Sequence, residues 1–276
     1  MLKLDSRDYA LAWPLLKEVK INTLFAEGVL SGQTTGSVYV DSVNDPRSFY
    51  VAHEYGMSLV YGDSGNEEFN RSLSDYITNK TGHRHSAEWL QADPAGGWDP
   101  LIEAMLTEHN ARLDAADSRR MYIQTRVNFT FDPEVYNRAK AQWFRQDAEM
   151  VQMNGEGFGE QEGAVIPRYF WRDAEHFLAS GKGYTILWEG EQASSAFSAY
   201  RTADMLEIGI ESAPGYRGKH FAFSVCCKLI DYCLEQGLEP VWGCRQENVG
   251  SYRLAQKLGF KPLLNIPYYR LSELPV

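Results

Sequence analysis

The first half of the chain contains both strand-like and helix-like patterns of hydrophobic residues. Alternating or β-rich apolar runs predict strands at 37–41, 48–53, 56–61 and 121–131. Apolar residues at helical spacing predict helices over 10–27, 67–79 and 100–113. The segment 93–97 (DPAGG) is a loop by composition. This half therefore has both strands and helices.

The second half has a more regular order of elements. A helix at 171–179 precedes strands at 184–188, 193–199 and 205–212, a helix at 218–235, a strand at 240–244, a helix at 248–258 and a strand at 262–269. This order predicts an α/β protein of α+β type with a mixed sheet and one parallel crossover. Glycine and acid concentrate at 154–162 (NGEGFGEQE), so we place a boundary close by. The predicted domains are an N-terminal α/β lobe over 1–145 and a second domain over 146–276.

Composition narrows the class of protein. The 276 residues are 44% hydrophobic and 23% charged, as in ordinary globular chains. A net charge of −10 disfavours nucleic acid and anionic membranes as partners and suits a cationic small molecule. No apolar run approaches the ~18 residues of a membrane helix, and the first residues do not form a secretory signal. We therefore expect a cytoplasmic protein, for which a homodimer is compatible with the sequence.

The four cysteines do not suggest a metal or disulfide framework. Cys226, Cys227 and Cys233 fall on one predicted helix, and with Cys244 they form no CxxC pair. We expect reduced thiols, with Cys226 and Cys233 in the core, and no metal site.

The segment 211–227 (ESAPGYRGKHFAFSVCC) carries the first chemical signal. A β-rich run turns at Pro214-Gly215 and enters a predicted helix near Arg217. The first amides of a helix have no intrahelical partner and attract anions, and Arg217 and Lys219 add full positive charges. A diphosphate would fit there. The alternative is an ordinary surface helix with basic residues near its start.

The segment 241–260 (VWGCRQENVGSYRLAQKLGF) favours the first interpretation. A strand leads to Asn248 and a helix, which ends at Gly259 as a typical C-cap. With 217–222 (RGKHFA), this segment resembles the GCN5-related N-acetyltransferase (GNAT) superfamily. Further runs, including 23–32 (TLFAEGVLSG), 36–46 (GSVYVDSVNDP), 169–200 (YFWRDAEHFLASGKGYTILWEGEQASSAFSAY) and 206–210 (LEIGI), resemble its zwittermicin-resistance-type branch.

The resemblance implies a GNAT fold in the C-terminal half and a second α/β lobe in the N-terminal half, which could be a degenerate GNAT-like copy that closes one side of the substrate cleft. It also implies acetyl-CoA as co-substrate, with its diphosphate held by the family motif Arg/Gln-x-x-Gly-x-Gly/Ala. Arg217 and Ala222 match this motif, whereas His220 occupies the central glycine position. A helical backbone at His220 would still present its amide. The predicted coenzyme-binding residues are Ile210, Ser212, Arg217, Gly218, Lys219, His220, Phe221, Ala222, Asn248 and Ser251.

Acetyl transfer to an amine needs a base, an oxyanion donor and an acid. We assign the base to Glu207, with Glu211 as fallback, and the oxyanion donor to the Ile210 amide. Strand alternation places Glu207 on the face opposite Ile208 and Ile210, so a bulge or edge exposure would decide which side chain meets the substrate. The family often has an acidic Tyr in the pattern Leu-Tyr-x-Lys, but this chain has Ala255 there. Ser251 or Tyr252 could replace it; packing for Tyr252, and helix capping for Asn248, are the structural alternatives.

The predicted function is acetyl transfer from acetyl-CoA to a primary amine of a small molecule. A non-catalytic acyl-CoA-binding or regulatory protein with the same fold is the alternative, and His220 and the absent tyrosine favour it. An acyltransferase acting on protein or aminoacyl-tRNA is a third option, which the acidic charge disfavours for RNA.

Overall fold

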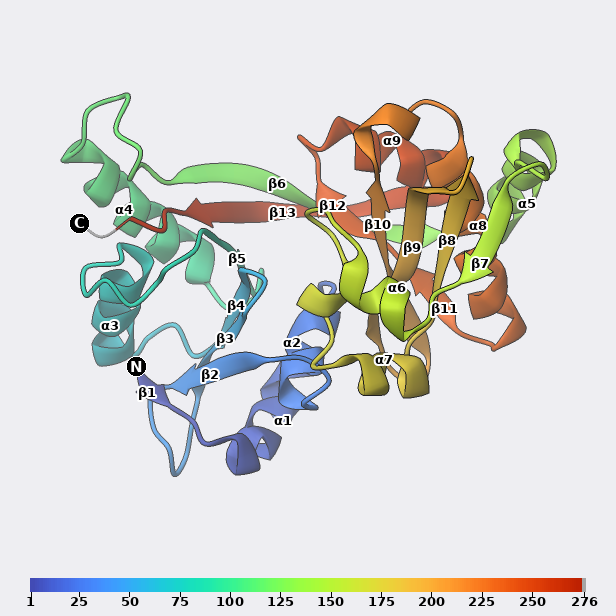
Figure 1. Cartoon of the computed structure of the whole chain (residues 1–276). Coiled ribbons are helices and arrows are strands. Elements are labelled where there is room, and N and C mark those ends of the chain that lie inside the picture. The colour runs from blue at the N-terminus through green and yellow to red at the C-terminus, as the bar shows by residue number, and fades with distance from the viewer. Residues whose placement is uncertain (275–276) are drawn as a thin grey trace. The chain divides into compact units, whose positions relative to one another are not determined.

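The computed structural model describes residues 1–274 (Figure 1). Contacts divide the chain into two compact units. Unit 1 comprises Met1–Arg126 with the C-terminal stretch from Asn265, and unit 2 comprises Val127–Leu264. This division differs from the predicted one at 145/146, because two long strands, β6 (Tyr122–Phe131) and β13 (Phe260–Leu271), start in one unit and end in the other. In the part of the chain described, no helix is both long and apolar enough to cross a membrane.

Unit 1 is an antiparallel meander followed by a parallel crossover. Its strands are β1 (Leu2–Lys3), β2 (Gly36–Val40), β3 (Ser48–His53), β4 (Met57–Gly62) and β5 (Glu88–Ala92), followed in the sheet order by β13 and β6. Its helical segments are η1 (Ser6–Ala12), α1 (Trp13–Leu16), α2 (Leu24–Leu30), α3 (Glu67–Ile77) and α4 (Trp98–Ala111). Strands β2, β3 and β4 pair antiparallel, and β4 pairs parallel with β5 across α3. One core cluster of unit 1 includes Tyr50, Val60, Phe69, Leu90 and Trp98.

Unit 2 repeats this order of elements. Its strands are β7 (Glu149–Gln152), β8 (Gly183–Trp188), β9 (Glu191–Arg201), β10 (Met205–Ser212), β11 (Glu239–Val241) and β12 (Gly243–Arg245). Its helical segments are α5 (Pro133–Trp143), α6 (Gly155–Glu160), η2 (Pro167–Tyr169), α7 (Ala174–Ser180), η3 (Pro214–Tyr216), α8 (Phe221–Glu235) and α9 (Val249–Lys257). Strands β7 to β10 pair antiparallel, and β10 pairs parallel with β11 across α8 (Figure 1).

Helix α8 packs on one face of the five-stranded sheet β11-β10-β9-β8-β7. Its apolar stripe, which includes Val225, Leu229 and Ile230, joins Ile186, Ala196, Leu206 and Ile208 of the sheet in one core. The opposite face carries Phe197 and Tyr200, whose rings contact Phe170 just after η2. The side chains of β10 therefore alternate between the α8 face and the Phe170 face.

All four cysteines are buried free thiols. Cys226, Cys227, Cys233 and Cys244 belong to the core beneath α8, so the prediction of core thiols is confirmed. Burial raises the pKa of Cys227 and Cys233 to about 12, which makes both poor nucleophiles at neutral pH.

Several predicted elements differ in the structure. The single helix predicted over 10–27 is instead the three short segments η1, α1 and α2, and residues 17–23 between α1 and α2 are not helical. Helix α7 begins at Ala174, three residues after the predicted start, because Asp173 caps it. The strand predicted at 240–244 is divided at Trp242, whose buried ring lies against Phe260, so that β11 joins one sheet and β12 the other. The acid- and glycine-rich segment 154–162 contains α6, because Asn154 caps it by accepting a hydrogen bond from the Gly157 amide at 2.8 Å.

Candidate active site

The sheet of unit 2 opens along the second half of β10. Strand β10 pairs with β11 from Met205↔Glu239 to Glu207↔Val241. The chain then leaves at Trp242, and β12 lies beside β6 in the other sheet. Within residues 1–274, the stretch from Ile208 to Ser212 therefore has a strand neighbour, β9, on one side only.

The backbone groups on this open edge can be assigned from the pairing. The Ala213 amide donates to the Ala193 carbonyl at 3.1 Å, so alternate residues from Ala213 backwards face β9. The residues between them, which include Ile210 and Ser212, turn their amides and carbonyls towards the opening. The Ser212 amide donates to the Glu211 carboxylate at 3.1 Å. An extended chain of amides could add to this edge as an extra strand does.

The turn after β10 leads into α8 through two left-handed residues. Arg217 is extended (φ −66°, ψ 150°), Gly218 has φ +78°, and His220 has φ 63° and ψ 11°. Helix α8 therefore begins at Phe221, and the prediction that it begins at Gly218 was wrong by three residues. The expectation of a helical backbone at His220 was also wrong. A glycine adopts this conformation without strain, which accounts for glycine at this position of the motif.

The start of α8 is left without a side-chain cap. His220 is the N-cap residue, and its side chain accepts no hydrogen bond from the first turn. The amides of Phe221, Ala222 and Phe223 have no partner among residues 1–274. The basic residues Arg217 and Lys219 precede them, and no acidic residue lies in the first turn. This is a chemically suitable place for a phosphate-bearing ligand.

Three residues beside this turn were not predicted as site residues. The Trp143 ring stacks on the His220 imidazole, with centroids 4.9 Å apart and planes at 21°. The Lys257 ammonium lies 3.8 Å from the Trp143 centroid and 3.4 Å from His220 Nδ1. Arg145 donates from its backbone to Ser224 Oγ and from its guanidinium to the Lys219 carbonyl. Lys257 lies within the segment that resembles the family, but Trp143 and Arg145 have no local signal.

The two carboxylates of β10 are in different situations. Glu207 is 5% exposed, lies opposite Tyr200 and Val241, and shares the Phe170 face of the sheet. A register shift in the β9 pairing falls between Glu207 and Ile208, which is the irregularity that the sequence left open. Glu211 accepts hydrogen bonds from the amides of Ala164 and Val165 at 2.8 and 2.9 Å. Glu211 therefore anchors a neighbouring loop.

The predicted residues near α9 have structural partners. Asn248 caps α9 by accepting a hydrogen bond from the Ser251 amide at 3.2 Å. The Ser251 hydroxyl accepts one from Trp242 Nε1 at 3.2 Å. Tyr252 is half-buried against Phe129, at 5.6 Å between ring centroids. The hydroxyl of Tyr252 has no hydrogen bond within residues 1–274, so a ligand could bond to it.

Unit 1 has the same turn position without the same chemistry. Its helix α3 follows β4 as α8 follows β10, but Asn66 accepts hydrogen bonds from the amides of Glu68 and Phe69, both at 3.1 Å. The first turn of α3 is acidic, with Glu67 and Glu68. Strand β5 also pairs with β4 up to Val60↔Ala92, which leaves a shorter unpaired stretch. An anion would be repelled there.

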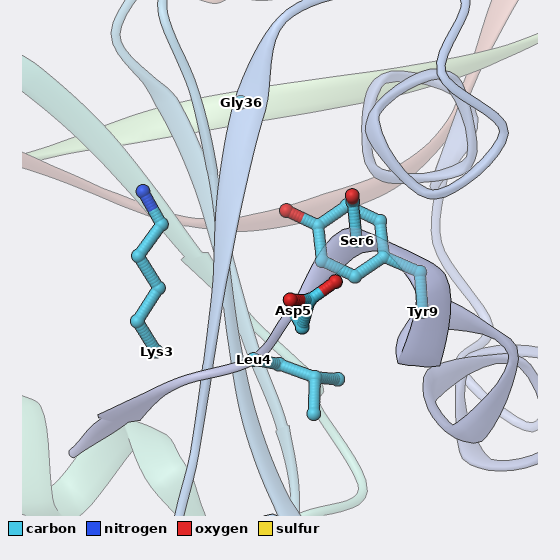
Figure 2. A pocket seen from close by; sticks show the side chains of 6 residues that line it. All are labelled: Lys3, Leu4, Asp5, Ser6, Tyr9 and Gly36. Atoms are coloured by element: carbon cyan, nitrogen blue, oxygen red, sulfur yellow. The ribbon is translucent and has the colours of Figure 1, made fainter.

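A groove of about 500 Å³ lies in unit 1 and is separate from the features above. Figure 2 shows its lining, which consists of Lys3, Leu4, Asp5, Ser6, Tyr9 and Gly36. It contains none of the predicted site residues. Within residues 1–274, no cluster of three or more His, Cys, Asp or Glu side chains suits a metal ion.

Comparison with known proteins gives the family of the chain. A family model described as GNAT acetyltransferase matches residues 14–269. An uncharacterised N-acetyltransferase of Bacillus subtilis strain 168, YdfB, is 24% identical over 249 residues, which cover 89% of each chain.

Solved structures show the same fold. A GCN5-related N-acetyltransferase-like protein from Streptococcus suis 89/1591 has a TM-score of 0.71 at 22% identity, covering 96% of this chain and 99% of its own. A tandem GNAT protein from the clavulanic acid biosynthesis pathway, solved without AcCoA, has a TM-score of 0.60 at 11% identity and covers 100% of this chain and 98% of its own.

Proposed function

Because the chain belongs to the GNAT acetyltransferase family and is thus an N-acetyltransferase, we propose that it transfers an acetyl group from acetyl-CoA to a primary amine of a small molecule. The observation that carries the proposal is the open edge of β10 beside the uncapped, basic start of α8. One part suits an extended amide-bearing arm and the other suits a diphosphate.

The coenzyme would lie along both features. Its diphosphate would accept hydrogen bonds from the amides of Phe221 and Ala222, next to Gly218, where a Cβ would meet nothing within 4 Å. Arg217 and Lys219 would supply charge, with His220 between them and the helix. The pantetheine arm would pair with the backbone of Ile210 and Ser212, where Glu211 would release the Ser212 amide. Asn248 and Ser251 would support it from α9.

Each chemical step of acetyl transfer can then be assigned to a residue. A lysine-like amine has a pKa of about 10.4, so it must lose a proton before it attacks the thioester carbonyl. Glu207 would take that proton, directly or through a water. The Ile210 amide would donate to the oxyanion of the tetrahedral intermediate. As the C–S bond breaks, the thiolate of CoA would take a proton from Tyr252 or Ser251, or leave as the thiolate.

The proposal also covers the acetyl acceptor and the branch of the GNAT superfamily to which the chain belongs. The net charge of −10 favours a cationic amine. The runs 23–32 and 169–200 support the zwittermicin-resistance-type branch, in which the acceptor would be an aminated antibiotic or toxin. The repeated order of strands and helices supports unit 1 as a degenerate GNAT-like copy. We place acetyl transfer in the cytoplasm.

A non-catalytic acyl-CoA-binding protein is the alternative that His220 in the turn and Ala255 in place of a tyrosine favour, whereas the family match argues against it. Turnover separates the two. Purified protein, acetyl-CoA and a panel of primary amines would be incubated, and free CoA thiol would be followed over time. Release of many equivalents with at least one amine supports the enzyme. Tight binding of CoA with no release for any amine supports the binding protein.

The turn itself is tested with Arg217→Glu. Reversing this charge beside the diphosphate should raise the Kd for CoA by about 10- to 100-fold, the range of a charge-assisted hydrogen bond. Arg71→Glu makes the same change on the exposed side of α3 and should leave the Kd unaltered. Equal Kd values for wild type and Arg217→Glu would remove the turn from the coenzyme site.

A further inference from the structure

His220 holds a conformation that its side chain does not favour. Its φ of 63° and ψ of 11° lie in the left-handed region. This region costs a non-glycine residue roughly 1 kcal/mol or more, and the structure around such a residue must offset that cost. A residue placed under strain at the start of a ligand-binding helix is a candidate for function.

Two side chains from two helices contact His220 and offset the strain. Trp143 at the end of α5 stacks on His220, and Lys257 at the end of α9 contacts both rings, as given above. We call Trp143, His220 and Lys257 the clasp. Because Lys257 Nζ donates to His220 Nδ1, the neutral imidazole carries its own proton on Nε2.

The charges around the imidazole are mostly positive. Lys257 approaches from α9, and Arg145 approaches from the segment after α5 and is paired with Asp147. Arg217 and Lys219 precede it on the turn, and the Lys219 ammonium lies over the Tyr216 ring. Burial lowers the pKa of His220, and the charges of Lys257 and Arg145 lower it further. In the free protein the imidazole is therefore neutral at neutral pH.

We propose that the clasp couples binding of the CoA diphosphate to uptake of one proton by His220, an inference that rests on the proposed function. A diphosphate at the amides of Phe221 and Ala222 places negative charge beside the imidazole and stabilises its charged form. A proton from solvent then adds to Nδ1, and no covalent bond between heavy atoms forms or breaks. Lys257 Nζ loses its acceptor and turns to the phosphate oxygens while it stays over Trp143.

His220 therefore supplies a charge that a glycine at this position could not supply. Glycine would allow the same turn and a close approach of the backbone, but it would bring no charge. With histidine, a cation forms only when the anion arrives, so the empty site avoids a further positive charge close to Lys257 and Arg145. The affinity for CoA should fall as pH rises through the pKa of His220 in the complex, because the proton is then no longer taken up.

Calorimetry of CoA binding in two buffers with different ionisation enthalpies measures this proton directly. The 3′-phosphate of CoA titrates near pH 6 on its own, so the comparison is between wild type and His220→Asn. Asparagine tolerates the left-handed conformation and does not titrate in this range. We expect proton uptake to be larger in wild type by up to about one proton per CoA, and the Kd of wild type to rise more steeply with pH.

Two further variants sharpen the test. Lys257→Met removes a neighbouring cation and should move the proton uptake to higher pH. His85→Gln removes an exposed histidine of unit 1 and should leave the uptake unchanged. Equal uptake in wild type and His220→Asn, with CoA still bound, overturns the clasp alone. Absence of CoA binding to the wild type overturns the clasp and the proposed function together.

Discussion

At the scale of single residues, the two carboxylates of β10 lie in different surroundings. Glu211 receives hydrogen bonds from the amides of Ala164, Val165 and Ser212, so its negative charge is already used within the fold. Glu207 is buried beside Tyr200 on the face that leads away from α8. We therefore keep Glu207 as the proposed base and treat Glu211 as a residue that anchors the 164–165 loop.

Glu207→Gln should lower kcat by about 10²-fold or more, in the range of a lost general base, and leave the Kd for CoA nearly unchanged. The amide has almost the volume of the carboxylate, so packing is preserved. Steady-state kinetics with the best amine and calorimetry with CoA measure the two effects. Glu211→Gln is the matched variant, and we expect it to lower stability more than kcat. A larger loss of kcat in Glu211→Gln than in Glu207→Gln would reverse the assignment.

His53 gives unit 1 a dependence of stability on pH. Its Nδ1 accepts a hydrogen bond from the Tyr55 amide, so Nε2 carries the proton and contacts Thr34 Oγ1 at 2.8 Å. Burial lowers its pKa to about 4. The unfolded chain, with a pKa near 6.5, binds a proton in the window between these values while the folded chain does not. Stability must therefore fall as pH decreases from about 6.5 towards 4.

The expected loss across this window is about 2 to 3 kcal/mol, the linkage value for a shift of this size. Urea unfolding at pH 7.5 and pH 4.5 gives the free energy of unfolding at each end. His53→Asn should have a lower stability at pH 7.5 and a smaller loss between the two pH values. An identical loss in both proteins would mean that other groups carry the pH dependence.

At the scale of elements, the sequence predicted those with a strong period and missed those without one. The predicted boundaries of β3, β10 and the start of α3 agree with the structure, because their apolar residues alternate or recur cleanly. Strand β5 (EWLQA) was missed because polar residues share its buried positions. Helix α5 was missed because it buries only Tyr136, too narrow a stripe to give a helical period.

The site residues likewise fall into those that the sequence predicted and those that it missed. The turn 217–222 and the segment 241–260 were found because each is continuous in sequence. Trp143 and Arg145 were missed because they reach the turn from the end of α5 and the segment after it, far earlier in the chain, and only the folded structure brings them together. The left-handed backbone of His220 could not be predicted from residue type, since histidine favours other conformations.

Strand β10 depends on a glycine at its centre. A Cβ at Gly209 would lie 2.5 to 2.9 Å from ring atoms of Phe197, which is fully buried. Gly209→Ala should therefore destabilise the protein by about 1 to 3 kcal/mol through overpacking. Gly159→Ala is the control, since no atom lies within 4 Å of its Cβ position.

A double mutant identifies the cause. Phe197→Leu shortens the ring that the new methyl group would meet, so Gly209→Ala combined with Phe197→Leu should lose less stability than the sum of the single variants. Urea unfolding of the four proteins supplies the cycle. Simple additivity would mean that Gly209 is needed for its backbone and not for the space beside Phe197.

At the scale of the whole molecule, the family match covers residues 14–269 and thus both units, and both units have an antiparallel meander followed by a parallel crossover. They differ in the turn before the crossover helix. In unit 2 the turn is basic and the helix start is uncapped, whereas in unit 1 Asn66 occupies the amides and acids follow it. The same topology therefore offers an anion two very different environments.

One molecule of CoA should therefore bind per chain. Calorimetry should give a stoichiometry near one, and Arg217→Glu should weaken all of the binding. Asn66→Ala uncaps α3 and should cost about 1 kcal/mol of stability. It should not create a second site, because Glu67 and Glu68 would still repel a phosphate. A stoichiometry near two, or binding of CoA to Arg217→Glu with unchanged affinity, would show that unit 1 binds the coenzyme. In that case the cap and the acidic residues at the start of α3 would not prevent binding.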